Sequence, residues 1–233
     1  MLVRFSQLVV EQQQIREIDI NPLLVGSDRI VALDARVVLF PSDTPARELP
    51  RPAIRPYPSQ YVMPWTTKDG TPVLIRPIRP EDEPLLINFH RTLSEQSVQF
   101  RYFNTIKLSQ RVTHARLIRV CFNDYDREMA LVIEHRDPKT QEPAILGVGR
   151  LSKLPGGHDS EFAILVSDQW QGQGLGFELL RRLVQIGRDE GLDRIGADIL
   201  SANGSMQGVA RKLGFSIECS PDVGVVRAQL QLR

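Results

Sequence analysis

A short glycine-rich stretch is the part of this sequence best suited to binding a ligand. Residues 171–176 read QGQGLG and lie between an apolar, strand-like run (159–166) and an amphipathic, helix-like run (177–191). Glycine lets backbone N–H groups come close to a ligand, and the N-terminus of a helix carries partial positive charge. The stretch therefore predicts a loop that binds phosphate groups.

Two familiar phosphate-binding loops do not fit this stretch. A Walker-type loop ends in Gly-Lys-Ser or Gly-Lys-Thr, whereas Gly176 is followed by Phe177. A dinucleotide fingerprint, G-x-G-x-x-G, needs a glycine at position 177 or 179, where the chain has Phe177 and Leu179. Asp198 does lie about twenty residues further on, as that fingerprint requires. A turn with no ligand is a further alternative, which three alternating glycines and two long amides make less favoured.

The elements around the loop predict one α/β (α+β) domain at residues 65–233. Its sheet should be mixed and mostly antiparallel, with helices on both faces, because three successive strand-like runs form a meander before a helix–strand–helix–strand order begins. We expect strands at 71–77, 128–135, 144–151, 159–166, 194–200, 215–220 and 224–232, and helices at 83–94, 177–191 and 204–214.

The chain before this domain divides into two segments. Residues 1–40 predict a helix followed by a hairpin whose turn is at 26–28, and they are too few for an independent core. Residues 41–64 hold seven of the sixteen prolines, so we interpret them as an extended, semi-rigid linker.

Polar residues of the hairpin could gather on one face. If they do, Asp19, Asn21 and Asp34 would converge as oxygen ligands for Mg²⁺; a half-exposed hairpin with a solvated face is the favoured alternative. EIDINPL followed by ALDAR resembles the C-terminal end of the ATP-grasp subdomain in nucleoside-diphosphate-forming acyl-CoA synthetases, where the positions of Asn21 and Asp34 hold Mg²⁺. Because only about forty residues are covered, ligase activity is not carried over to this chain, and a remnant or a fragment boundary is the better interpretation.

The glycine-rich loop resembles a different family. The pattern Q-x-x-G-x-G at Gln171, Gly174 and Gly176 is similar to the acetyl-CoA pyrophosphate loop of the GNAT N-acetyltransferases. Asn203 and the KLGF segment at 212–215 match further family positions, and the resemblance covers roughly 160 residues. It implies that acetyl-CoA is the donor and that the coenzyme-binding residues are Leu165, Val166, Gln171, Gly172, Gln173, Gly174, Leu175, Gly176, Phe177 and Asn203. In that scheme the backbone of 172–177 binds the pyrophosphate, and the backbone of 165–166 binds the pantetheine.

Acetyl transfer to an amine needs a base and a donor to the developing oxyanion. The end of the strand at Leu165 and Val166 can supply a backbone donor, and Glu161 lies on the same strand face as Leu165 by period-two alternation. A lone glutamate is more often a surface carboxylate. However, EFAILV resembles the EFA-x-x-V segment of bacterial protein acetyltransferases, which implies that Glu161 is the catalytic base. Asp159 and Asp198 are the alternatives.

The general acid has no candidate in this sequence. Many GNAT enzymes carry a tyrosine five residues before the phenylalanine of the closing Gly-Phe pair, and that position is Ala210 here. The thiolate of coenzyme A would then leave without an acid, or water would protonate it.

Composition limits the partners. The net charge is +1, which gives no electrostatic footprint for nucleic acid or an acidic membrane surface. The two cysteines and four histidines show no metal-ligand spacing, and no apolar run reaches the roughly 20 residues of a membrane helix. We expect a cytoplasmic protein without a metal site.

Together these features predict an acetyl-CoA-dependent N-acetyltransferase. The combination of a synthetase-like segment with a GNAT domain resembles bacterial protein lysine acetyltransferases that modify acyl-CoA synthetases, so the expected acceptor is a lysine Nε of such a protein. Two alternatives stay open: a GNAT enzyme that acts on a small-molecule amine, and a non-catalytic domain that senses acyl-CoA.

Overall fold

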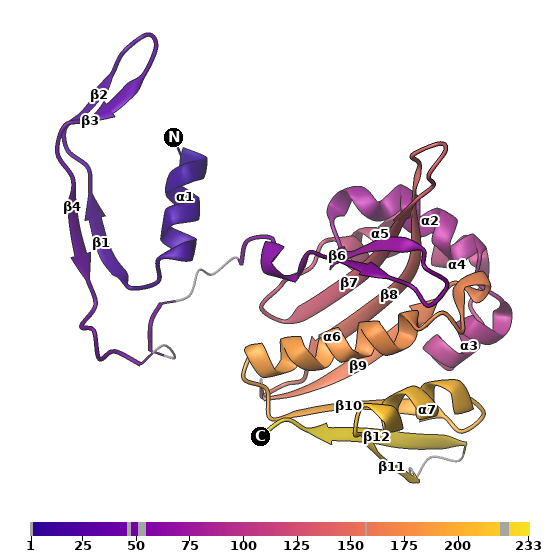
Figure 1. Cartoon of the computed structure of the whole chain (residues 1–233). Helices are drawn as coiled ribbons and strands as arrows, with labels where there is room; N and C mark the ends of the chain where they lie inside the picture. Colours follow the sequence, from indigo (N-terminus) through magenta and orange to yellow (C-terminus); the bar gives the residue numbers. More distant parts are fainter. Residues whose placement is uncertain (1, 46–47, 51–54, 157, 220–223) are drawn as a thin grey trace. The chain divides into compact units, whose positions relative to one another are not determined.

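The computed structural model describes residues 2–45, 48–50, 55–156, 158–219 and 224–233, and it divides into two compact units. The first unit comprises residues Met1–Pro56 and the second Tyr57–Arg233 (Figure 1). No helix in the described part of the chain has the length and apolar composition that crossing a membrane requires.

The first unit contains the predicted helix and hairpin. Helix α1 spans Leu2–Glu11, and strand β1 (Ile15–Asp19) pairs antiparallel with β4 (Arg36–Leu39). The tip of the hairpin is a separate antiparallel pair, β2 (Leu23–Val25) with β3 (Ile30–Ala32), and a cis Asn21–Pro22 bond lies between the two pairs. Asp19 is opposite Arg36 in the register. Within the described residues, no three His, Cys, Asp or Glu side chains form a group that could hold a metal ion.

The second unit is built on one eight-stranded sheet with the order β11-β12-β10-β9-β8-β7-β6-β5. Every neighbouring pair is antiparallel except β9 and β10, which confirms the mixed, mostly antiparallel sheet. The strands are β5 (Met63–Thr66), β6 (Pro72–Pro77), β7 (Glu128–Arg136), β8 (Pro143–Lys153), β9 (Asp159–Val166), β10 (Arg194–Leu200), β11 (Ser216–Cys219) and β12 (Val225–Gln231).

Helices cover both faces of this sheet (Figure 1). Ala130 and Val132 of β7 pack with α2 and α5 in one apolar core, whereas Leu131 and Ile133 pack with α6 and α7 in the other. This alternation is the period-two pattern of a strand buried on both sides. The helices are α2 (Glu83–Arg91), α3 (Glu95–Tyr102), α4 (Leu108–Arg111), α5 (His114–Cys121), α6 (Leu175–Asp189) and α7 (Gly204–Lys212).

The second unit begins earlier than the sequence indicated. Tyr57, inside the segment interpreted as a linker, donates a hydrogen bond from its hydroxyl to the carbonyl of Pro77 at 3.0 Å. Strand β5 also begins inside that segment. Its Pro64 is tolerated because β5 is an edge strand, where a residue without an N–H group need not cost the sheet a hydrogen bond. Residues 46–47 and 51–54 of the expected linker lie outside the described residues. Helices α3, α4 and α5 were not predicted.

The parallel pair β9–β10 ends well before either strand does. Its register runs only from Asp159 opposite Arg194 to Glu161 opposite Gly196. Strand β9 continues to Val166, where it is paired with β8 but no longer with β10. The two strands therefore diverge after Glu161, and one edge of β9 is left without a partner strand.

A buried ion network fixes the start of α2 to the sheet. Two nitrogens of the Arg76 guanidinium donate to the Asp82 carboxylate at 2.6 and 2.7 Å, and the Nε group donates to Glu134 at 2.8 Å. All three side chains are at most 7% exposed. Burial alone would lower the pKa of Arg76, but the hydrogen bonds with Asp82 and Glu134 outweigh it and raise that pKa.

Substituting Asp82→Asn should lower the free energy of unfolding of the second unit by about 3 kcal/mol, because it removes one of the two carboxylates that compensate the buried Arg76 charge. Urea denaturation followed by circular dichroism measures this effect. The control is Arg136→Gln, since Arg136 binds the same Glu134 with a side chain that is 59% exposed. Solvent screening should keep its effect below about 1 kcal/mol. Equal effects for the two variants would contradict this account of the network.

Candidate active site

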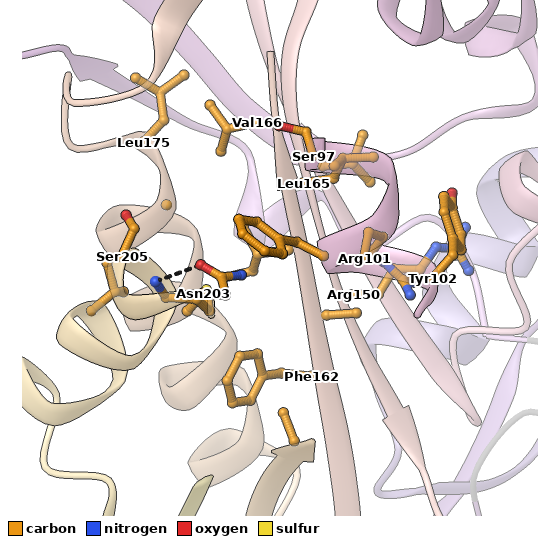
Figure 2. Close-up of a pocket in the computed structure, with 18 of the residues that line it drawn as sticks. Ser97, Arg101, Tyr102, Arg150, Phe162, Leu165, Val166, Leu175, Asn203 and Ser205 are labelled. Carbon is orange, nitrogen blue, oxygen red and sulfur yellow. Dashed lines mark hydrogen bonds between the residues drawn. The ribbon is translucent and has the colours of Figure 1, made fainter. Parts of the chain in front are cut away.

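A cleft of about 1760 Å³ opens where β9 and β10 diverge. One side is formed by the loop after β9 and by the first turns of α6 and α7, and the other side by α3, α5 and β8. Figure 2 shows this arrangement, with Leu175, Asn203 and Ser205 on one side and Arg101, Tyr102 and Arg150 on the other. The predicted site residues line the cleft with the exception of Gln173.

The glycine-rich loop joins β9 to α6 as the sequence predicted. After a short 3-10 turn at Asp168–Trp170, Gly172 and Gly174 adopt φ values of +79° and +91°, which side chains other than glycine rarely allow. Helix α6 then begins at Leu175. Its first N–H groups have no acceptor within the helix, so they are free to bind an anion, and the helix dipole favours negative charge there.

Three glycines of the cleft have no packing reason to be glycine. A Cβ atom added to Gly176, Gly204 or Gly208 would meet nothing within 4 Å, and none of the three has a positive φ. All three lie in helices, where alanine is normally favoured over glycine by roughly 0.5–1 kcal/mol. Glycine at these positions keeps the helix backbone accessible to a bound molecule.

A lysine from the β5 edge of the sheet contacts the glycine-rich loop. The backbone N–H of Lys68, in the turn between β5 and β6, donates to the carbonyl of Gln173 at 3.2 Å. Its side chain lies against Gly174, with Cε 3.5 Å from where a Cβ of that glycine would be. Sequence reasoning missed Lys68, because nothing in the local pattern connects it with a loop about one hundred residues later. Its ammonium group adds positive charge beside the predicted pyrophosphate site.

Two residues of the loop hold helix α3 in place. The carboxylate of Asp168 accepts hydrogen bonds from the N–H of Ser94 at 2.9 Å, the hydroxyl of Ser94 at 2.6 Å and the hydroxyl of Ser97 at 3.0 Å. The Gln171 amide donates to the same Ser97 hydroxyl at 3.1 Å and to the carbonyl of Val166 at 3.4 Å. Burial would raise the pKa of Asp168, but the hydrogen bonds from Ser94 and Ser97 outweigh it and hold that pKa below its ordinary value.

The open edge of β9 passes through the cleft. Between Phe162 and Val166 this strand pairs only with β8, so backbone groups on its other edge are available to a ligand that runs alongside it. Leu165 and Val166, the residues predicted to bind pantetheine, are at the end of this open edge. An extended ligand chain could therefore bind as a strand would.

Glu161 lies at the point where β9 and β10 separate. Its partner in β8 is Ser152 and its partner in β10 is Gly196. The carboxylate is partly exposed and lies 3.8 Å from a guanidinium nitrogen of Arg227, which also binds Asp198 at 3.2 Å. Glu161 can thus accept a proton from a molecule in the cleft.

The other two candidate carboxylates differ in position. Asp198 lines the cleft beside Glu161, but its carboxylate is bound by Arg227. Asp159 does not line the cleft and forms an ion pair with Arg194. Of the two carboxylates that line the cleft, Glu161 has the longer contact with Arg227, at 3.8 Å compared with 3.2 Å for Asp198.

The start of α7 forms the wall that faces β9. Asn203 caps this helix, since its side-chain oxygen accepts a hydrogen bond from the N–H of Met206 at 3.1 Å. The position where a tyrosine was expected, Ala210, is completely buried and does not line the cleft. It belongs to the apolar core that also contains the buried side chains of α6.

Two family descriptions match this chain. Residues 73–216 match the description "Acetyltransferase (GNAT) domain", and residues 1–39 match "ATP-grasp domain". An acetyltransferase of Pseudomonas aeruginosa is 31% identical over 155 residues, which are 66% of this chain and 80% of that protein. A stretch of 65 residues is 40% identical to the L-methionine sulfoximine/L-methionine sulfone acetyltransferase of the same organism, and covers 28% of this chain and 38% of that protein.

Solved structures share the fold. The GNAT domain of S. lividans PAT superimposes with a TM-score of 0.67 and 26% identity, covering 76% of this chain and 99% of that domain. YncA of Salmonella typhimurium, whose structure contains acetyl-CoA as its cofactor, gives a TM-score of 0.51 and 23% identity, covering 69% of this chain and 94% of that one. The second likeness supports the fold alone.

The substitution Gly176→Ala should separate ligand binding from folding. We expect the free energy of unfolding to stay the same or rise by about 0.5–1 kcal/mol, because the added methyl group meets no protein atom and alanine favours a helix. Affinity for acetyl-CoA should fall by about tenfold or more, since the methyl group occupies the approach of the phosphates to the backbone. Calorimetric titration measures the affinity.

Gly174→Ala provides the contrast to this variant. Its φ of +91° should make alanine cost about 1–2 kcal/mol of stability. If Gly176→Ala binds acetyl-CoA as well as the wild type does, the assignment of this helix end to the phosphates is wrong.

Proposed function

Because this chain belongs to the GNAT acetyltransferase family, we propose that it transfers the acetyl group of acetyl-CoA to the Nε atom of a lysine in a protein, with an acyl-CoA synthetase as the expected acceptor. The observation that carries the proposal is the separation of β9 from β10 beside Glu161. A thioester bound along the open edge of β9 would have its carbonyl next to backbone N–H groups and close to a carboxylate.

In the proposed reaction, Glu161 acts as the general base. A lysine amine has a pKa near 10.4 in water, so it must lose a proton before its lone pair can attack. Glu161 accepts that proton, directly or through a water molecule, as the nitrogen bonds to the thioester carbon. A backbone N–H at the end of β9 stabilises the oxyanion, the C–S bond then breaks, and the coenzyme A thiolate takes a proton from solvent.

Two observations support a protein acceptor. Residues 1–39 match an ATP-grasp domain, which is consistent with the resemblance of EIDINPL and ALDAR to acyl-CoA synthetases. The cleft, at about 1760 Å³, also extends past the coenzyme-binding loop to a second wall formed by α3 and α5.

A small-molecule amine is the second candidate acceptor. It is favoured by the 40% identity to an L-methionine sulfoximine/L-methionine sulfone acetyltransferase over 65 residues. Incubation with acetyl-CoA and either a purified acyl-CoA synthetase or L-methionine sulfone separates the two. Mass spectrometry should find acetyl-lysine on the synthetase, whereas acetylation of the sulfone alone would favour the small-molecule activity.

The substitution Glu161→Gln should lower kcat by about 10²- to 10⁴-fold, the usual contribution of a positioned general base. The amide is nearly the same size and does not touch the loop, so the Kd for acetyl-CoA should change by less than about twofold. Release of the coenzyme A thiol measures turnover, and calorimetry measures binding.

Asp159→Asn is the matched control, because that carboxylate lies outside the cleft. Its kcat should stay within about twofold of the wild-type value. Wild-type turnover in Glu161→Gln would contradict the role of Glu161. Binding of acetyl-CoA by the wild-type protein with no turnover would instead favour a non-catalytic sensor.

A further inference from the structure

The wall of the cleft formed by α3, α5 and β8 is lined by arginines. Arg101 comes from the end of α3, Arg116 and Arg119 from α5, and Arg150 from β8. Figure 2 shows Arg101 and Arg150 beside Tyr102, on the side of the cleft away from Asn203 and Ser205. None of these arginines belongs to the loop that the coenzyme is expected to use.

One tyrosine ring brings two of these charges together. The guanidinium carbons of Arg101 and Arg116 each lie 5.0 Å from the centre of the Tyr102 ring. The two guanidinium carbons are therefore separated by no more than twice 5.0 Å. Cation–π contacts of this kind hold the guanidinium planes in place without using their N–H donors.

One carboxylate beside this wall, that of Glu128, is already bound by other side chains of the protein. Glu128 accepts hydrogen bonds from Arg150 and, at 3.0 Å, from the hydroxyl of Ser152. In the part of the chain that the structure describes, neither Arg101 nor Arg116 forms an ion pair with a carboxylate. The wall therefore carries positive charge that the protein does not neutralise by direct contact.

The pKa values of two groups near the wall are lowered in part by this positive charge. Burial lowers the pKa of Arg101, and the charges of Arg150 and Arg116 lower it further, although Tyr102 and Glu128 act in the opposite direction. The pKa of His90, on the neighbouring α2, falls to about 4, because of its burial first and of Arg111 and Arg116 next. Half-buried cations without a carboxylate partner are less well solvated than exposed ones, so an anion that enters this part of the cleft would be stabilised.

We infer that the acceptor carries a carboxylate close to its reacting amine, and that Arg101 and Arg116 bind this carboxylate. The inference rests on the proposed acetyl transfer to an amine in the same cleft. Carboxylate fits because the planar guanidinium presents two parallel N–H donors to its two oxygens. The wall is also near the proposed base. Arg150 is opposite Ala163 in the register, so it is a diagonal neighbour of Glu161, and the Cα atoms of such neighbours are roughly 7–8 Å apart.

The carboxylate could come from two sources. In a protein acceptor it would be an aspartate or glutamate side chain next to the lysine. In a small-molecule acceptor it would be the α-carboxylate of an amino acid. Both present the same group to the same arginines, so the experiment contains one arm for each.

The test compares matched acceptors that differ only in this charge. The peptide arm uses blocked lysine peptides with Glu or Gln on either side of the lysine. The amino-acid arm uses lysine and methionine sulfone with their primary amides. We expect wild-type kcat/KM to be about 10- to 100-fold higher for the carboxylate member of a pair, as charge-assisted hydrogen bonds typically contribute. The arm that shows this preference identifies the source.

The variant Arg101→Gln/Arg116→Gln should reduce this preference to about one- to twofold, and leave kcat/KM for the uncharged member within about threefold. Arg127→Gln is the matched control, because Arg127 is 85% exposed and lies outside the cleft, and it should keep the full preference. Unchanged acetyl-CoA binding shows that the double variant is folded.

The outcomes are distinguishable. Acetylation by the wild type without a preference for the carboxylate overturns the inference and leaves the proposed function intact, and this result does not depend on any variant folding. A preference that survives in the double variant also overturns it. A wild-type protein that binds acetyl-CoA but acetylates no member of either arm contradicts the proposed function itself.

Discussion

The site of this protein depends on two parallel strands that stop pairing. Backbone N–H and C=O groups at the centre of a sheet are normally all bonded, so a strand that loses its neighbour needs another partner. Here β9 loses β10 after Glu161 and remains bonded to β8. The same divergence that creates the cleft also exposes the polar edge to which an extended ligand can bond, and it puts a carboxylate at the point of separation.

The remaining elements are arranged around this opening. Helices α6 and α7 pack on one face of the sheet and direct their N-terminal turns into the cleft, while α3 and α5 close it from the other face. The buried network of Arg76, Asp82 and Glu134 fixes the start of α2, against which α5 packs. These charges therefore have a structural role. Arg101 and Arg116 of the cleft wall differ from them, because neither has a carboxylate in direct contact among the residues that the structure describes.

Sequence patterns predicted the elements that carry their own periodicity. The strands β7, β8 and β9 alternate or are continuously apolar, and α6 has a long amphipathic face, so both the meander and the loop between β9 and α6 were predictable. Helix α3 was not, because its eight residues bury little more than Val98, and its cap Ser94 depends on Asp168, 74 residues away. Lys68 was also missed because its contact is with a residue distant in the sequence, Gln173. The cluster of arginines could not be predicted because α3 and α5, which carry three of them, were not predicted.

Asp168 has a consequence for how the two substrates affect each other. This one carboxylate joins the loop proposed to hold the donor to the helix proposed to face the acceptor. If binding of acetyl-CoA orders this contact, the acceptor meets a wall that is already in place, and its affinity rises by some factor. Thermodynamic linkage requires that the acceptor then raise the affinity for acetyl-CoA by the same factor. Under that condition, each substrate would act as an effector of the other.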